Sequence, residues 1–534
     1  MMEDMGHIQA SFFQHRNAIL FSILSGALSI APHFLAEWTI GDVYHGIPFL
    51  FQANEDYYLA RVHEILDGYW SIASAFFYEY KHSTPLVAPV GEYFFALLAV
   101  LGFGAVGSLM VAKFLFPALL FLLIYSLIYT LVGTEKPHAQ LTGITGGVLG
   151  VLGIGLTDYA SLLALIRESV SYPLLSIWTR PVNPITGALL LGIFLLLMNS
   201  LTRTPRPLFA VLSGVLIATM TGYVFAFGIA VAFLGCLAVV TLYTRRWNVL
   251  WSYVLAGAVA LIIAGLYAWM ALSGPESGSL LRNGLMIGHE PLMNKILLLA
   301  LVIISGCFWL ARKSTDPDTL HTLWFSLSLV MAGFIVLNQQ VVTGFTIWPH
   351  HFSQYTTLFA LIGVVVATSV TIGVTFPYVF RVGAYTAILL SVVYAGGTAF
   401  TYTSVMDEFR SLQQFAPAFT WLNAHAPEDC VALVAESEAA LFTDFVPGFT
   451  HCNVYYTSYV VGVVPEERSR HNYFAQLYVR GVAPAEIETY FKEHQHELLT
   501  YFYRDWSELV VTHDMTRINA LEPTLAAEYR QFVS

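Results

Sequence analysis

Long runs of apolar residues recur along this 534-residue chain, and they constrain its fold more than any other feature. A run of about 20 apolar residues is long enough to cross the hydrocarbon core of a bilayer as a helix. Only 11% of the residues are charged, whereas ordinary soluble domains have about 25%. A soluble enzyme, a coiled coil and a disordered chain are therefore excluded. The sequence predicts a mostly α-helical, polytopic membrane protein.

Eleven transmembrane spans are expected from these runs. The first is interpreted as a helix and not as a cleavable signal, because its apolar run is long and no small-residue cleavage site follows it. A polar break at 219–222 divides one long run into two crossings. The predicted spans are 18–35, 112–131, 141–156, 185–201, two within 208–242, 249–272, 296–311, 320–337, 352–376 and 382–401.

The apolar segment 85–104 is interpreted as a re-entrant or interfacial helix, because prolines, a glycine and Glu92 interrupt its start. With this segment not crossing, all the short loops on the side of the N-terminus are basic. Such loops are cytoplasmic by the positive-inside rule. The basic residues in question are Lys136, Arg203, Arg206, Arg245, Arg246, Arg312, Lys313 and Arg381. The N-terminus is therefore expected in the cytoplasm, and the C-terminal region outside it.

Two regions follow from this topology. Residues 1–410 are expected to form the membrane domain, with a long first outer loop at 37–113. Residues 411–534 are polar and are expected to form a small extracytoplasmic α/β domain. Within it, the patterns predict a helix end at 421–425, a buried strand at 430–434, a β-rich run at 454–464 and an amphipathic helix at 485–499. Cys430 and Cys452 lie in this region, where an oxidising compartment would allow a disulfide.

Adjacent carboxylates, Glu55 and Asp56, stand in the first outer loop ahead of an amphipathic helix that stops at Gly68. Such a pair can hold a hard divalent cation or supply a general base. The alternative is a structural one, since acidic residues also favour the start of a helix. Both interpretations stay open from the spacing alone.

The other outer loops carry further candidate site residues. Arg180 suits phosphate binding, because its guanidinium can form two parallel hydrogen bonds. The amides and the His pair near the fourth outer loop suggest a polar cavity, since unpaired amides at a membrane boundary are costly. Interfacial anchoring and helix capping are the alternatives. The candidates are Asp158, Arg180, Asn183, Arg282, Gln339, His350 and His351.

Glu55-Asp56-Tyr57-Tyr58-Leu59-Ala60-Arg61 resembles the first-loop motif Asp-Pro-Tyr-Tyr-x-x-Arg of oligosaccharyltransferase catalytic subunits. These belong to the GT-C superfamily of membrane glycosyltransferases, whose long first outer loop and topology the first 400 residues also resemble. Glu55 stands in place of the family's aspartate. The family's second acidic motif has no clear counterpart, and Asp158 is the nearest acid. The Trp-Trp-Asp acceptor motif is absent, which argues against glycosylation of Asn sequons.

The resemblance implies hexosyl or pentosyl transfer from a polyprenyl-phosphate-linked donor to a glycan, lipid or protein acceptor on the outer face. Glu55 or Asp56 would act as base. If the reaction needs Mg²⁺ or Mn²⁺, the ligands would be Glu55, Asp56 and Asp158. A transporter or flippase and a non-catalytic assembly protein are the alternatives. The expected substrate-binding residues are Tyr57, Tyr58, Arg61, Arg180, Asn183, Arg282, Gln339, His350 and His351.

The expected location is the prokaryotic plasma membrane. No nucleic-acid partner is expected, because the formal net charge is −11 and phosphate backbones require a basic surface. The chain also lacks the P-loop and dinucleotide-binding motifs, which indicates that it does not use a nucleotide in the cytoplasm.

Overall fold

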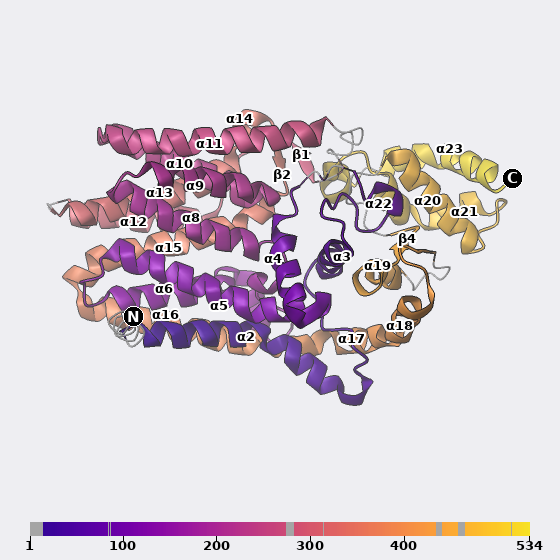
Figure 1. The fold of residues 1–534 in the computed structure, drawn as a ribbon, viewed down its shortest axis with the longest axis horizontal. Helices are drawn as coiled ribbons and strands as arrows, with labels where there is room; N and C mark the ends of the chain where they lie inside the picture. Colours follow the sequence, from indigo (N-terminus) through magenta and orange to yellow (C-terminus); the bar gives the residue numbers. More distant parts are fainter. Residues whose placement is uncertain are drawn as a thin grey trace.

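A computed structural model describes residues 14–83, 85, 87–273, 282, 284–312, 314, 316–433, 440–457, 465–513 and 515–534. Long helices lie side by side in one bundle, and the C-terminal helices gather at one end of it (Figure 1). The chain is a multi-pass membrane protein by the length and apolarity of these helices.

Eight helices within the described residues are long and apolar enough to cross a membrane. They include α2 (Arg16–Ile40), α5 (Gly104–Val132), α8 (Ile185–Arg203), α10 (Val224–Tyr243), α11 (Trp247–Leu272), α13 (Pro317–Asn338), α15 (Pro349–Thr375) and α16 (Pro377–Thr398). Three predicted spans coincide with shorter apolar helices, which are α6 (Ala139–Val151), α9 (Pro207–Thr219) and α12 (Lys295–Ala311). The total of eleven crossings stays a prediction.

Small residues let two of these helices approach closely. A Cβ atom added to Gly143 or Gly147 of α6 would lie 2.7 Å from the ring of Tyr125 or of Phe121 on α5. Membrane helices associate largely through such tight packing, because lipid tails are as apolar as their side chains. Substituting either glycine would push α6 away from α5.

The segment predicted as re-entrant or interfacial forms α4 (Val90–Leu98) and a π-helical turn (Ala99–Phe103). Gly102 and Gly104 have φ of 110° and 66°, which break the helical path before α5. Positive φ of this kind costs glycine little. In Figure 1, α4 crosses the end of the bundle instead of continuing along it.

The segment predicted as the first outer loop also contains α3 (Glu55–Leu66), which ends before Gly68 as predicted. The helix lies between α4 and α19 (Ala440–Phe449) in Figure 1. It is buried on nearly every side and not on one face alone. The later loops predicted to be outer ones form α7 (Tyr159–Ile166), α14 (Gln340–Thr343) and an antiparallel strand pair, β1 (Leu285–Ile287) with β2 (Phe345–Ile347).

The C-terminal region is mainly helical where it is described, so the predicted α/β character is not confirmed. Its strands β3 (Val431–Ala432) and β4 (Asn453–Val454) have two residues each. The helices are α17 (Met406–Leu412), α18 (Ala416–His425), α19, α20 (Glu466–Val479), α21 (Ile487–Glu493), α22 (Gln495–Phe502) and α23 (Met515–Val533).

The individual predictions for this region have mixed outcomes. The helix end at 421–425 is confirmed, because α18 ends at His425. The strand at 430–434 is wrong in its burial, since Val431 is 48% exposed. Most of the β-rich run, residues 458–464, and residue 434 lie outside the described residues. The helix expected over 485–499 is divided at His494 into α21 and α22. Cys430 and Cys452 form a disulfide.

Two hydrophobic cores divide the C-terminal residues. The first is continuous with the membrane bundle and includes Phe445, Val446 and Cys452. The second runs from Tyr456 to Tyr529 and involves α20 to α23. The part around α18 and α19 therefore packs on the membrane domain, while the last helices have a core of their own. The predicted division after residue 410 stays a prediction.

Candidate functional site

Glu55, predicted as a catalytic or metal-binding carboxylate, is buried against the membrane bundle with an exposed fraction of 1%. It forms an ion pair with Lys113 of α5, which is equally buried. Its second oxygen accepts a hydrogen bond from the backbone N–H of Gln52 at 3.0 Å. Burial raises the pKa of Glu55, and the charge of Lys113 opposes that rise. This ion pair links the first residue of α3 to α5.

Arg61, predicted to bind substrate, is also engaged inside the protein. Its Nε donates to Glu92 of α4 at 2.6 Å, and both side chains are buried. Nη1 is 3.4 Å from the backbone oxygen of Ile72 and 3.4 Å from the Tyr57 hydroxyl. Tyr57 in turn stacks on Phe76. These contacts join α3 to α4, so Arg61 already has a carboxylate partner.

Arg180 is different, because it is buried without a carboxylate partner among the described residues. Its exposed fraction is 5%, and its Nε has no hydrogen-bond partner. The guanidinium carbon lies 5.5 Å from the centre of the Tyr58 ring, a cation–π contact. A buried charge without compensation is costly. The arrangement therefore suits an anionic ligand that would complete it.

The histidine pair at the start of α15 lies within the electrostatic reach of Arg180. His351 Nδ1 is 2.8 Å from the hydroxyl of Tyr223, and its ring stacks on Phe225. The His350 ring lies 4.4 Å from the His351 ring and is exposed at the surface. Arg180 and the two histidines, from two loops predicted to be outer ones, thus lie near enough for their charges to interact. We call these residues, with Tyr58 and Tyr223, the Arg180 cluster.

Tyr58 brings α3 into this cluster. Burial raises the pKa of its hydroxyl, and Arg180 is the largest influence that lowers it. The first-loop motif thus contributes Tyr58 to the cluster, while Glu55, three residues earlier on the same helix, holds Lys113.

Backbone strain also concentrates here. Val182, two residues after Arg180, has φ of 59°, and Trp348, two residues before His350, has φ of 30°. Left-handed φ costs a β-branched or bulky residue about 1–3 kcal/mol and persists only where the surroundings enforce it. A Cβ atom on Gly91 of α4 would lie 2.6 Å from the Val182 side chain. Strain of this kind is typical of functional sites.

Asn183 is buried next to Val182, and its side-chain oxygen accepts a hydrogen bond from Thr186 at 3.2 Å. The peptide bond between Asn183 and Pro184 is cis. The Pro184 oxygen accepts from the hydroxyl of Tyr355 at 2.8 Å. These bonds fix the turn that carries Arg180 into α8.

Three other candidates make contacts elsewhere. Asp158 is exposed and caps α7, accepting from the Ala160 N–H at 3.1 Å. Arg282 donates to the Tyr501 oxygen of the C-terminal region at 2.7 Å and lies over the Tyr503 ring. Gln339 is half-buried at the junction of α13 and α14. Within the described residues, no hydrogen bond or ion pair joins any of them to Arg180.

A divalent cation does not fit the predicted ligands. Glu55 faces the Lys113 ammonium, which occupies the position where a cation would bind, and Asp158 is engaged as a helix cap. The described part of the chain contains no group of three or more His, Cys, Asp or Glu residues that could hold a metal ion. We therefore derive no chemical step through a metal.

Sequence reasoning missed Lys113, which pairs with Glu55, and Tyr223 and Tyr355, which form or support the cluster. Lys113 stood inside a predicted span, and a charge at such a position is itself a functional signal. Tyr223 follows the polar break at 219–222 that separates two predicted spans. Tyr355 looked in the sequence like any other aromatic residue in an apolar run.

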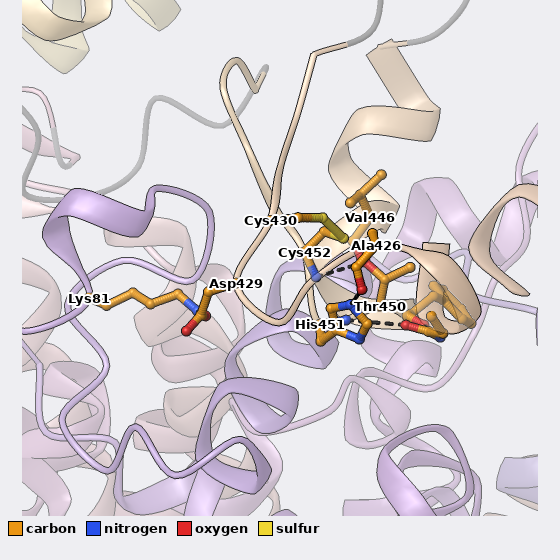
Figure 2. Close-up of a disulfide and its surroundings, with 10 residues drawn as sticks. Lys81, Ala426, Asp429, Cys430, Val446, Thr450, His451 and Cys452 are labelled. Carbon is orange, nitrogen blue, oxygen red and sulfur yellow. Dashed lines mark hydrogen bonds and ion pairs between the residues drawn. A yellow bond between two sulfur atoms is a disulfide. The ribbon is translucent and has the colours of Figure 1, made fainter. Parts of the chain in front are cut away.

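A buried lysine connects α3 with the C-terminal region beside the disulfide (Figure 2). Lys81 Nζ is 2.6 Å from Asp429 and 3.1 Å from Glu64. Asp429 also accepts from the Tyr69 hydroxyl at 2.5 Å, and it directly precedes Cys430. Burial raises the pKa of Glu64 to about 7, and Lys81 opposes this rise.

The stability of the protein is expected to fall with rising pH because of Glu64. Its ordinary pKa is 4.5 and its pKa in the folded protein is about 7. The folded state thus holds the proton more tightly, and this stabilisation is full below about pH 4.5 and is lost as the pH rises through about 7.

Melting temperatures measured between about pH 5 and about pH 8 should fall more steeply for wild type than for Glu64→Gln. Glu408→Gln, at an exposed position, should keep the wild-type slope; equal slopes in all three proteins would contradict the prediction.

No family model matches the chain, and no curated protein matches it either. Solved structures do match. One is an Archaeoglobus fulgidus oligosaccharyltransferase tethered to an acceptor peptide with an NVT sequon: identity is 13%, coverage is 93% of this chain and 72% of that chain, and the TM-score is 0.45. For its apo form the identity is 13%, the match covers 91% of this chain and 72% of that chain, and the TM-score is 0.46.

A third match is archaeal oligosaccharyltransferase AglB from the same organism, in complex with an inhibitory peptide and a dolichol-phosphate. Its identity is 13%, it covers 83% of this chain and 65% of that chain, and its TM-score is 0.40. The chain is thus similar to these oligosaccharyltransferase structures at low identity and at TM-scores below 0.5.

Proposed function

We propose that the chain is a membrane glycosyltransferase that moves a hexosyl or pentosyl group from a polyprenyl-phosphate-linked donor to an acceptor on the extracytoplasmic face. The observation that carries this proposal is the buried guanidinium of Arg180, which lacks a carboxylate partner among the described residues. The two histidines beside it supply further polar groups.

Arg180 precedes α8, one of the apolar helices long enough to cross a membrane. A phosphate at this position would leave its polyprenyl chain in the hydrocarbon next to the bundle. The guanidinium can form two hydrogen bonds with that phosphate. As the sugar departs, negative charge grows on the phosphate oxygen, and a fixed donor in a site shielded from water stabilises this charge strongly.

The base role is assigned to Asp56. Asp56 is half-buried in the first turn of α3, two residues before Tyr58 of the cluster. In the proposed reaction, an acceptor oxygen forms a bond to the anomeric carbon. The carbon–oxygen bond to the phosphate breaks, with its electron pair going to the phosphate, and the acceptor proton passes to the Asp56 carboxylate.

The test is turnover by the full-length protein in detergent, with polyprenyl-phosphate-linked hexose and pentose as donors. Release of polyprenyl phosphate is measured with and without hydroxyl-bearing acceptors. Wild type should release it, and Asp56→Asn should be slower by about 10²-fold or more, as loss of a general base predicts. Asp42→Asn, an exposed outer-loop substitution, is the matched control and should match wild type. No release by wild type from either donor would overturn the proposed function, and full activity of Asp56→Asn would overturn the assignment of the base.

A further inference from the structure

A polar cavity lies at the other end of α8 from the Arg180 cluster. Its volume is about 340 Å³, within the range of small-molecule sites. Since α8 has 19 residues, its two ends are about 28 Å apart, close to the thickness of a bilayer core. The walls come from α5, α8 and α13, and the lining residues that matter here are Thr130, Glu135, Asn199, Ser200, Arg203 and Asp318.

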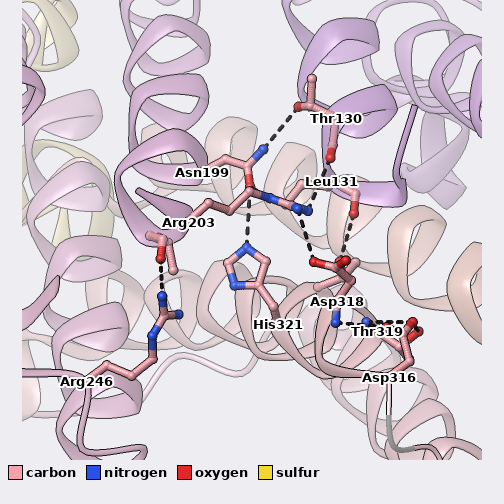
Figure 3. Close-up of polar contacts among 11 residues, drawn as sticks. Thr130, Leu131, Asn199, Arg203, Arg246, Asp316, Asp318, Thr319 and His321 are labelled. Carbon is pink, nitrogen blue, oxygen red and sulfur yellow. Dashed lines mark hydrogen bonds and ion pairs between the residues drawn. The ribbon is translucent and has the colours of Figure 1, made fainter. Parts of the chain in front are cut away.

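Arg203 is the cation of this cavity, and two of its three hydrogen bonds are long (Figure 3). Nη1 lies 3.1 Å from Asp318, Nη2 lies 3.4 Å from the Thr130 backbone oxygen, and Nε lies 3.5 Å from the Asn199 side chain. Distances beyond about 3.2 Å mark weak hydrogen bonds. The Arg203 side chain is also 37% exposed. Apart from its ion pair with Asp318, the guanidinium is therefore held weakly and is open to a ligand.

Two carboxylates line the cavity together with this cation. Asp318 is 67% exposed on its side chain, and a Cβ atom on Gly133 would lie 2.6 Å from the Glu135 carboxylate, which therefore lies over that glycine. The C-terminal ends of α5 and α8 add partial negative charge, and the N-terminal end of α13, where Asp318 lies, adds partial positive charge. The cavity therefore presents both signs of charge. A ligand with both an ammonium and a phosphate group would satisfy both signs.

The position of the cavity indicates where such a ligand comes from. Val132 and Leu196 give the wall an apolar part. The cavity lies at the ends of α8 and α13, which are long and apolar enough to cross a membrane. Lipid headgroups lie at such helix ends, because they border the hydrocarbon core of the bilayer.

We infer that this cavity binds the headgroup of a phospholipid that carries a primary ammonium, such as phosphatidylethanolamine. The phosphate contacts Arg203, and the ammonium donates to Glu135 and Asp318. The N–H donors are essential to the fit, because a trimethylated ammonium cannot hydrogen-bond to the carboxylates. This inference does not depend on the proposed function.

The test is lipid binding to the full-length protein by native mass spectrometry, with phosphatidylethanolamine, phosphatidylcholine and phosphatidylglycerol of identical chains. Phosphatidylethanolamine should bind at least about tenfold more tightly than the other two. Glu135→Gln and Arg203→Gln should each weaken it about tenfold, since each removes a charge-assisted hydrogen bond. Arg245→Gln, an exposed basic residue outside the cavity lining, is the matched control and should bind as wild type does.

Several outcomes would overturn the inference. Equal binding of the three lipids would show that no headgroup is selected. Tighter binding of phosphatidylglycerol would show an anion site. Unchanged binding of phosphatidylethanolamine to Glu135→Gln would show that the ammonium does not contact Glu135. If Arg203→Gln does not fold, Glu135→Gln alone tests the inference. Soluble phosphoethanolamine that competes as well as the whole lipid would identify a small polar metabolite, and not a membrane lipid, as the ligand.

Discussion

Replacing Arg180 with glutamine is expected to lower kcat/KM for a polyprenyl-phosphate-linked sugar by about 10²- to 10³-fold, because a fixed donor to the developing phosphate charge is lost. The same substitution should leave the melting temperature unchanged or raise it. The buried guanidinium lacks a carboxylate partner within the described residues, so its removal relieves a desolvation cost. Activity and stability measured on one purified sample would check both parts.

Two further substitutions sharpen this result. Arg180→Lys keeps the charge but loses the planar pair of donors, so its kcat/KM should lie between those of wild type and Arg180→Gln. Arg282→Gln is the matched control, since Arg282 contacts the C-terminal region and not the Arg180 cluster. Should Arg180→Gln melt several degrees lower than wild type, Arg180 has a structural role and the anion site is wrong.

Replacing Lys113 with methionine is expected to destabilise the protein by about 3–5 kcal/mol. Both members of the Glu55–Lys113 pair are buried, and removing one leaves the other charge without compensation. The double substitution Glu55→Gln with Lys113→Met should be much closer to wild type, because no unpaired charge remains. Denaturant unfolding in detergent, followed by tryptophan fluorescence, measures these differences.

The double-mutant cycle supplies the control for this prediction. Residues in direct contact show coupling energies of about 0.5–3 kcal/mol, whereas independent residues are additive. Lys492→Met, at an exposed position of α21, should change stability little and should be additive with Glu55→Gln. Additive effects of Glu55→Gln and Lys113→Met would mean that the ion pair does not form in solution.

Much of the architecture followed from the sequence because apolar length and helical structure are local properties. Each predicted span coincides with an apolar helix, and the predicted stops at Gly68 and His425 match the ends of α3 and α18. The start of α4 was marked by the prolines at the start of the segment 85–104, whereas the glycines that interrupt the helix before α5 were not recognised. These signals act within a few residues, so they can be recognised without knowledge of the fold.

The site was predictable only in part. Arg180 and the two histidines were selected as separate loop residues, and the structure brings them together. Glu55 and Arg61 were selected by their motif, but each has a buried partner, Lys113 or Glu92. A motif shows which side chains are present, whereas the partner that neutralises each charge comes from another helix.

Two other expectations are not confirmed, for a related reason. The C-terminal region was expected to contain substantial strands, because β-branched and aromatic residues are frequent there. Strand preference depends on the packing of neighbouring chains, and the described part of the region packs mainly as helices. Arg282 was grouped with the outer loops, but it turns toward Tyr501 and Tyr503 of the C-terminal helices.

The sequence by itself determined that this chain resides in a membrane, roughly where its helices run and which loops carry polar groups. These properties depend on hydrophobicity and on spacing along the chain. Only the tertiary structure decided which charges are paired and which are not. Burial makes an unpaired charge costly, and burial is a property of side chains that meet from distant segments. That is why Arg180 is distinguished from Arg61 and Arg282 only once the helices are packed together.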